Sequence, residues 1–199
     1  ERVVHLLAGL LRASGFEVHQ ATFDPPGAER HFRDSGPYHA LGPIPRLPLP
    51  LRPLVYLLAA LRLRRLKRHL ACEVSISNLW GSDLINVLSG GPGRKVALCH
   101  TAIIGNPSNR LMLSALPVVS KIYRRFDRVL AVSAELASEV KELYSLEECK
   151  IGVMENFVEV PKAVSRWRTS EPPMRFVWCG RFVEEKNVEG LLEVWSKFS

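Results

Sequence analysis

Residues 126–156 read FDRVLAVSAELASEVKELYSLEECKIGVMEN and contain a strand, a helix and a second strand. The apolar run at 128–132 predicts a buried strand, and Ser133 follows it as the N-cap of a helix. Leu136, Val140, Leu143 and Tyr144 recur at helical spacing on one face. Residues 150–155 predict the second strand. This order is a βαβ unit, in which the two strands are parallel.

The same alternation continues on the N-terminal side of this unit. Strands are expected at 73–77 and 95–99, with a helix at 82–89 between them. A helical stretch at 110–126 contains Pro117, which should kink or break it. Further elements are a helix at 1–14 with Gly15 as its C-cap, a strand at 16–23 and a helix at 53–70. The pattern predicts an α/β fold, a mostly parallel sheet with helices on both faces.

The character of the chain changes at residues 158–174, which carry three prolines and little apolar periodicity. We interpret this stretch as a linker between a first domain, 1–157, and the beginning of a second domain, 175–199. In the second domain residues 175–179 predict a strand, Gly180 a turn, and the residues from Asn187 onward a helix. The patterns at both ends of the chain are typical of interrupted elements, so we expect a fragment of a longer protein.

Composition places the chain among globular proteins. Of its 199 residues 47% are hydrophobic and 24% are charged, which argues against extensive disorder. Its four cysteines are far apart and form no C-x-x-C pair, so they are expected to be buried in a reducing compartment. No apolar run approaches the ~20 residues that a membrane span needs. Gly90-Gly-Pro-Gly93 joins a helix to the start of a strand and is interpreted as a plain turn rather than a phosphate loop.

The net charge of +7 is concentrated in one stretch. Residues 46–70 contain seven basic residues and no acidic residue, which leaves 20 basic and 20 acidic residues elsewhere. Nucleic-acid binding is disfavoured, because the basic stretch has Tyr56 as its only aromatic residue. Four leucines and five basic residues make the helix at 53–70 a candidate for an anionic membrane surface. An ordinary covering helix with a basic end is the alternative.

Candidate site residues follow the predicted strands, because ligands of open α/β sheets bind beyond the carboxyl ends of the strands. In the first domain these residues are Asn78, Trp80, His100, Thr101, Ser133, Glu135 and Asn156. In the second domain Gly180 ends a strand, Arg181 follows it, and Lys186 lies where the next helix begins. Two cations beside a helix N-terminus suit a phosphate group. A solvated turn with Arg181 and Lys186 paired to glutamates is the alternative.

Three segments carry a resemblance to a known family. They are FDRVLAVS at 126–133, KIGVMEN at 150–156 and GRFVEEKNVEGLL at 180–192. Together they resemble the retaining GT-B glycosyltransferases of family 4, and ERVV at 1–4 with GFEV at 15–18 resembles the first helix and second strand of that family. The likeness is weakest over residues 24–70.

The resemblance implies two Rossmann-like domains facing a cleft, with the acceptor on the first and a nucleotide-sugar donor on the second. Gly180, Arg181 and Lys186 match the motif that contacts the donor diphosphate, and His100 matches a histidine near the transferred sugar. Catalytic roles are therefore expected for His100, Arg181 and Lys186. A purely structural histidine remains the alternative for His100. The resemblance implies no metal and no cofactor.

This sequence differs from the pattern of the family at two positions along the chain. The hinge motif Asn-Gly-Val-Asp is replaced by Asn156-Phe-Val-Glu159, and the sequence starts at Glu1, after the position where the glycine-rich loop of the family would lie. The implied activity is transfer of a sugar to a glycan or lipid-linked acceptor by a cytoplasmic enzyme, peripheral on a membrane. We expect residues 1–199 alone to be inactive. The competing interpretation is a non-catalytic module that binds a membrane or a partner through residues 53–70.

Overall fold

A computed structural model of the chain describes residues 2–24, 36–43, 52–104, 113–157, 178, 180 and 187–197. The chain forms two compact units, Glu1–Glu159 and Val160–Ser199. The described strands all belong to the first unit, and the described helix of the second unit is α7 (Val188–Ser196). The domain boundaries at 157 and 175 remain predictions.

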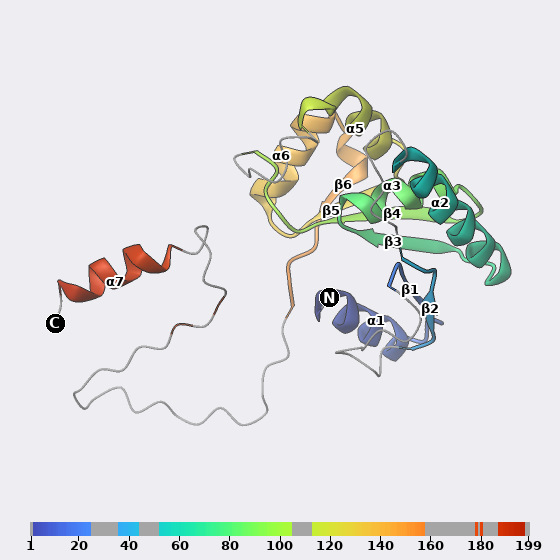
Figure 1. The fold of residues 1–199 in the computed structure, drawn as a ribbon, viewed down its shortest axis with the longest axis horizontal. Helices are drawn as coiled ribbons and strands as arrows, with labels where there is room; N and C mark the ends of the chain where they lie inside the picture. Colours follow the sequence, from blue (N-terminus) through green and yellow to red (C-terminus); the bar gives the residue numbers. More distant parts are fainter. Residues whose placement is uncertain are drawn as a thin grey trace. The chain divides into compact units, whose positions relative to one another are not determined.

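Four parallel strands form the main sheet of the first unit (Figure 1). In spatial order they are β3 (Val74–Asn78), β4 (Arg94–Cys99), β5 (Arg128–Ala131) and β6 (Ile151–Val153). Ala97 of β4 pairs with Ser77 of β3 and with Val129 of β5. The strands advance across the sheet in one direction, so right-handed crossovers place the connecting helices on one face.

The connecting helices α3 (Trp80–Ser89), α5 (Leu116–Tyr123) and α6 (Ala134–Tyr144) enclose the main core with that face. The core includes Ala97, Val119, Phe126, Val129, Val140 and Tyr144, none more than 1% exposed. The ring of Tyr123 stacks on that of Tyr144 with centroids 4.3 Å apart. Figure 1 shows α1 (Arg2–Ala13) on the other side of the sheet. The predicted α/β fold, with parallel strands and helices on both faces, is confirmed.

Pro117 breaks the long helix that was expected at 110–126. Leu113 and Ser114 are helical, Ala115 is not, and α5 begins at Leu116 with Pro117 in its first turn. Proline is tolerated there because the first N–H groups of a helix have no intrahelical acceptor. Ser133 is the N-cap of α6, as predicted, and its Oγ accepts a hydrogen bond of 3.2 Å from the backbone N–H of Leu136.

A second, two-stranded parallel sheet is formed by β1 (Gln20–Thr22) and β2 (Tyr38–Ala40). The strand expected at 16–23 is therefore shorter, and β2 was not predicted. The glycines and prolines around β2 read as loop, and its three residues carry too little alternation to identify a strand. His19 and His39 stack across the two strands, with 2.9 Å between Nδ1 of His19 and Nε2 of His39.

The basic helix is α2 (Arg52–His69), close to the predicted range. Val55, Ala59 and Ala60 are buried, and the two alanines pack with Ile85 of α3. Lys67 is also buried on this inner side, at 3% exposed. Within the described segments, no helix is both long enough and apolar enough to cross a bilayer.

A buried polar network connects α2, α3, β3 and α5. The Nζ of Lys67 donates to Oδ1 of Asn86 and, over 2.8 Å, to Oγ of Ser89. Asn86 Nδ2 donates to Ser77 Oγ over 3.1 Å, and Ser77 Oγ donates to Asp83 Oδ1 over 2.6 Å. The hydroxyl of Tyr123 donates to the other oxygen of Asp83 over 2.8 Å. These bonds fix α3 against the sheet and its neighbouring helices.

The structure also tests two smaller predictions, the burial of the cysteines and the turn at residues 90–93. Cys99 is buried, but Cys149 is exposed and Cys72 is partly exposed, so the expectation of four buried cysteines is wrong; Cys179 lies outside the described residues. The interpretation of residues 90–93 as a turn is confirmed. Gly93 has φ +85°, and a Cβ there would lie 2.4 Å from the carbonyl oxygens of Cys72 and Glu73, so this turn requires glycine.

Candidate functional site

Polar residues meet at the carboxyl edge of the main sheet. Asn78 ends β3, His100 follows β4, Ser133 follows β5 and Asn156 lies three residues beyond β6. The strands are parallel and adjacent, so these residues lie along one edge of the sheet. The sequence-predicted residues of the first unit are therefore brought together.

His100 is held at this edge with one ring nitrogen unused. Its Nε2 is buried and has no hydrogen-bond partner in the described structure. Burial lowers the pKa of the imidazole below its usual value, and a side-chain hydrogen bond with Asn156 partly offsets that effect. The lowered pKa favours the neutral ring at physiological pH. Nε2 can then donate or accept one hydrogen bond, depending on the tautomer.

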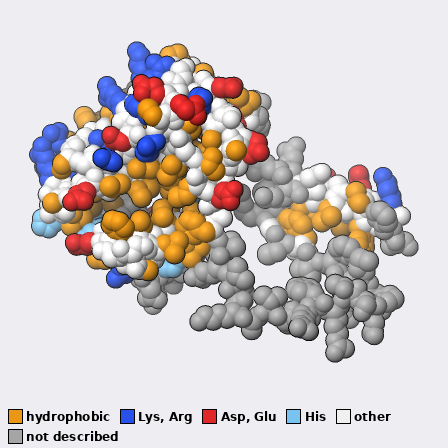
Figure 2. Space-filling model, turned by 180° about the vertical axis from the view of Figure 1, so that it is seen from behind, with side chains coloured by type: hydrophobic (Ala, Val, Ile, Leu, Met, Phe, Trp, Pro, Cys, Tyr) orange, Lys and Arg blue, Asp and Glu red, His pale blue; other side chains and the backbone are white. Residues whose placement is uncertain are grey.

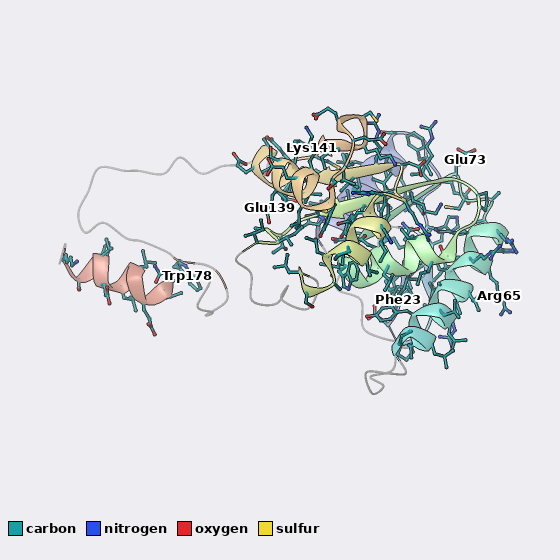
Figure 3. The ribbon with its side chains drawn as sticks, turned by 90° about the horizontal axis from the view of Figure 1, so that it is seen from above. Phe23, Arg65, Glu73, Glu139, Lys141 and Trp178 are labelled. Atoms are coloured by element: carbon teal, nitrogen blue, oxygen red, sulfur yellow. The ribbon has the colours of Figure 1, made fainter. Side chains whose placement is uncertain are left out.

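The loop that follows His100 is anchored by Glu139 of α6, which is labelled in Figure 3. Oε1 of Glu139 accepts hydrogen bonds from the backbone N–H groups of Ile103 and Ile104, over 2.7 and 2.6 Å. Charge-assisted bonds of this kind are roughly twice as strong as neutral ones. Sequence reasoning did not find Glu139, because its partners lie 35 and 36 residues earlier in the chain.

Asn78 shows a similar unused atom on the neighbouring strand. Its Oδ1 is buried without a hydrogen-bond partner in the described structure. The next residue, Leu79, has φ 79° and ψ 145°, a conformation that costs a non-glycine residue of order 1–3 kcal/mol. The Leu79 side chain is 67% exposed although it is apolar. The sequence placed Asn78 after a strand, but neither the orphaned oxygen nor the strain could be read from it.

Two of the other first-unit candidates, Ser133 and Trp80, have local structural roles. Ser133 is committed to capping α6. Trp80 begins α3 and stacks on Tyr123, with ring centroids 6.5 Å apart. Among the first-unit candidates, the buried hydrogen-bonding atoms that lack a partner belong to Asn78 and His100.

The predicted anion site of the second unit is only partly described. Arg181 and Lys186 lie outside the described residues, whereas Gly180 and α7 lie inside them. A Cβ at Gly180 would lie 2.9 Å from the indole of Trp178, so glycine permits this close approach. Asn187 caps α7, and its Oδ1 accepts a hydrogen bond of 3.3 Å from the N–H of Gly190. The helix therefore begins at Val188, and its N-cap Asn187 directly follows Lys186, at the position where the sequence predicted a helix to start.

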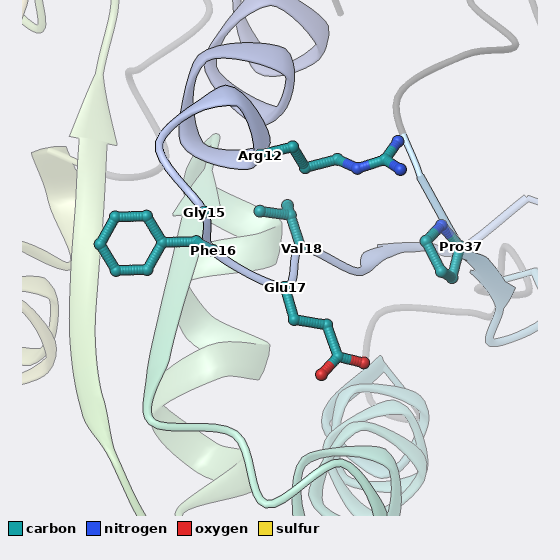
Figure 4. Close-up of a pocket in the computed structure, with 6 residues that line it drawn as sticks. All are labelled: Arg12, Gly15, Phe16, Glu17, Val18 and Pro37. Carbon is teal, nitrogen blue, oxygen red and sulfur yellow. The ribbon is translucent and has the colours of Figure 1, made fainter.

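An open hollow of about 430 Å³ lies elsewhere, beside the small sheet (Figure 4). It is lined by Arg12, residues 15–18 and Pro37. These residues precede β1 and β2, so the hollow lies at the amino ends of those strands. Ligands of α/β sheets bind at the opposite ends, and the hollow is not assigned to the site. Across the described part of the chain, no three histidine, cysteine or acidic side chains are grouped to hold a metal ion.

A parallel α/β sheet with a polar carboxyl edge defines the Rossmann-like class of ligand-binding domains. The sequence model of Glycosyltransferase Family 4 matches residues 1–161. The chain belongs to this family and is a glycosyltransferase domain. A search of curated proteins finds no significant match. The predicted family is confirmed.

Proposed function

We propose that the protein transfers a sugar from a nucleotide-sugar donor to a glycan or lipid-linked acceptor, with retention of anomeric configuration and without a metal or cofactor. Family membership supports sugar transfer in general. The observation that carries the proposal is His100, whose Nε2 has no partner among the described residues and lies at the sheet edge where this class of fold binds its ligands. Hexosyl transfer in cell-surface or lipid-linked glycan synthesis is the proposed setting.

The chemistry requires stabilisation of a leaving diphosphate. Negative charge accumulates on this group as the glycosidic bond breaks, so cations beside it bind the transition state more tightly than the ground state. Arg181 and Lys186 are proposed for this role, with Gly180 giving the donor diphosphate access to the backbone. His100 is proposed to hydrogen-bond a hydroxyl of the transferred sugar.

A donor panel tests this function in the full-length protein. UDP-, GDP- and dTDP-linked hexoses are offered with EDTA in excess over trace metal, and release of nucleoside diphosphate is measured. We expect one donor to be consumed and His100→Ala to slow its consumption. Proton NMR of the product should show the anomeric configuration of the donor. If the protein binds no nucleotide sugar but sediments with lipid, a non-catalytic membrane module replaces the proposal.

We further propose that α2 places the enzyme on the cytoplasmic face of an anionic membrane. Its outer side carries four leucines and then three arginines at helical spacing: Leu54, Leu57, Leu58 and Leu61, followed by Arg64, Arg65 and Arg68. The leucines are 44–54% exposed, and the arginines are exposed. Figure 3 labels Arg65, which lies toward the C-terminal end of α2. An ordinary covering helix would bury such a leucine stripe; α2 buries Val55, Ala59 and Ala60 instead.

Vesicle sedimentation tests the membrane proposal. Replacing Arg64, Arg65 and Arg68 together by glutamine is expected to weaken binding to phosphatidylserine vesicles roughly 100-fold, since each basic residue contributes about 1 kcal/mol at an anionic surface. Glutamine at the exposed Lys121 and Arg125 is the control and should change binding far less. Equal binding of the parent protein to neutral and anionic vesicles, or to neither, contradicts the proposal.

A further inference from the structure

Asn78 and His100 lie on the same face of the main sheet. In the register of β3 and β4, Asn78 is paired with Leu98. Side chains alternate along a strand, so Leu98 and the residue two positions later, His100, lie on the same side as Asn78. Ser77 and Cys99 alternate with them and lie on the side of α3 and α5: Ser77 bonds Asp83, and Cys99 belongs to the main core.

The two residues are neighbours across the strands. Adjacent strands are ~4.8 Å apart, and two residues advance ~6.6 Å, so the Cα atoms of Asn78 and His100 are separated by roughly 8 Å. Within the described residues, each of the two presents one buried hydrogen-bonding atom without a partner, Oδ1 of Asn78 and Nε2 of His100. Buried polar atoms are nearly always paired in native proteins, so two orphans at one sheet edge require an explanation.

The chemistry of the two atoms suits a carbohydrate. A carboxamide oxygen accepts a hydrogen bond, and a neutral imidazole nitrogen accepts or donates one. Hydroxyl groups on adjacent carbons of a sugar ring can satisfy two such atoms at once. Neither group carries charge at neutral pH, which does not favour a phosphate at this position.

We infer that Asn78 is a second sugar-binding residue, whose Oδ1 accepts a hydrogen bond from a hydroxyl of the same carbohydrate that His100 contacts. The inference rests on the proposed function and adds a residue to its site. The strained residue Leu79 directly connects Asn78, the last residue of β3, to Trp80, the first residue of α3. Asn78 therefore determines which hydroxyl pattern the site accepts.

Titration of His100 tests whether Asn78 and His100 lie close together on one face of the sheet, and it needs no sugar. In the full-length protein, Asn78→Asp places a carboxylate near the imidazole and should raise the pKa of His100 by roughly half to one pH unit, measured by ¹H–¹⁵N NMR of the ring. Val74→Asp is the matched control, because Val74 lies on the same face of β3, ~13 Å further back along the strand. Equal shifts in the two variants, or none in either, overturn the shared geometry.

Deoxy analogues test the contact itself. With the donor identified from the panel, removing the contacted hydroxyl should lower kcat/KM roughly tenfold for the parent protein and leave it nearly unchanged for Asn78→Ala. If a deoxygenated acceptor rather than a deoxygenated donor shows this loss of discrimination, the hydroxyl belongs to the acceptor. Unaltered discrimination by Asn78→Ala against both analogue series overturns the inference. Failure of the parent protein to use any donor overturns the proposed function instead.

Discussion

Replacing Arg181 by alanine in the full-length protein is expected to lower kcat roughly 10- to 150-fold. This range corresponds to the ~1.5–3 kcal/mol contributed by a hydrogen bond to a charged group, which in the proposed function Arg181 makes to the leaving diphosphate. Arg181→Lys should recover only part of the loss, because an ammonium group lacks the planar fork that binds two phosphate oxygens. Steady-state turnover of the donor is the measurement.

Arg175→Ala is the matched control for this prediction. It removes the same charge at the opposite, amino end of the strand predicted at 175–179, so donor kinetics should be nearly unchanged. A donor kcat and KM that do not change in Arg181→Ala would remove Arg181 from the site and return its motif to the alternative of a solvated turn.

The elements of the main sheet could be predicted because their signals are local. The run RVLAV at 128–132 is apolar and ends at a serine that caps the next helix, and both features were read correctly. β2 was missed because its pairing with β1 joins residues 18 positions apart, and three residues cannot show a period. The rule that parallel strands align their carboxyl ends predicted that His100 lies at the carboxyl edge of the sheet, where it follows β4.

The parts of the site that sequence could not supply depend on long-range contacts. Asn78 became a candidate for the sugar only when the register paired it with Leu98 and showed its Oδ1 to be unpartnered. Glu139 reads as one of several surface glutamates until its bonds to the loop after β4 are seen. The sequence indicates that Lys67 belongs to a solvated basic stretch. In the structure it is buried and donates hydrogen bonds to Asn86 and Ser89.

The network that contains Lys67 also contains Asp83, and the pKa values of both groups are displaced toward the neutral form. Burial raises the pKa of Asp83 from 3.8 to about 6, although hydrogen bonds from Ser77 and Tyr123 act in the opposite direction. Burial lowers the pKa of Lys67 from 10.5 to about 8. Between pH 4 and 6 the folded protein holds a proton on Asp83 that the unfolded chain has lost, so stability falls as pH rises through this window.

Substituting Asp83 by asparagine should remove this pH dependence. A displacement from 3.8 to about 6 corresponds to about 3 kcal/mol. The unfolding free energy of Asp83→Asn relative to the parent should therefore increase by most of that amount, about 2.4 kcal/mol, between pH 4 and pH 7, because the variant has no buried charge to create. The difference in unfolding free energy is measured at both pH values by urea unfolding, with hydrogen exchange of residues 74–99 as the readout because the network lies there.

Asp127→Asn is the control, since Asp127 is exposed and accepts one backbone hydrogen bond from Lys95. The same pH dependence in Asp83→Asn and the parent protein would show that Asp83 is already ionised at low pH in the folded state.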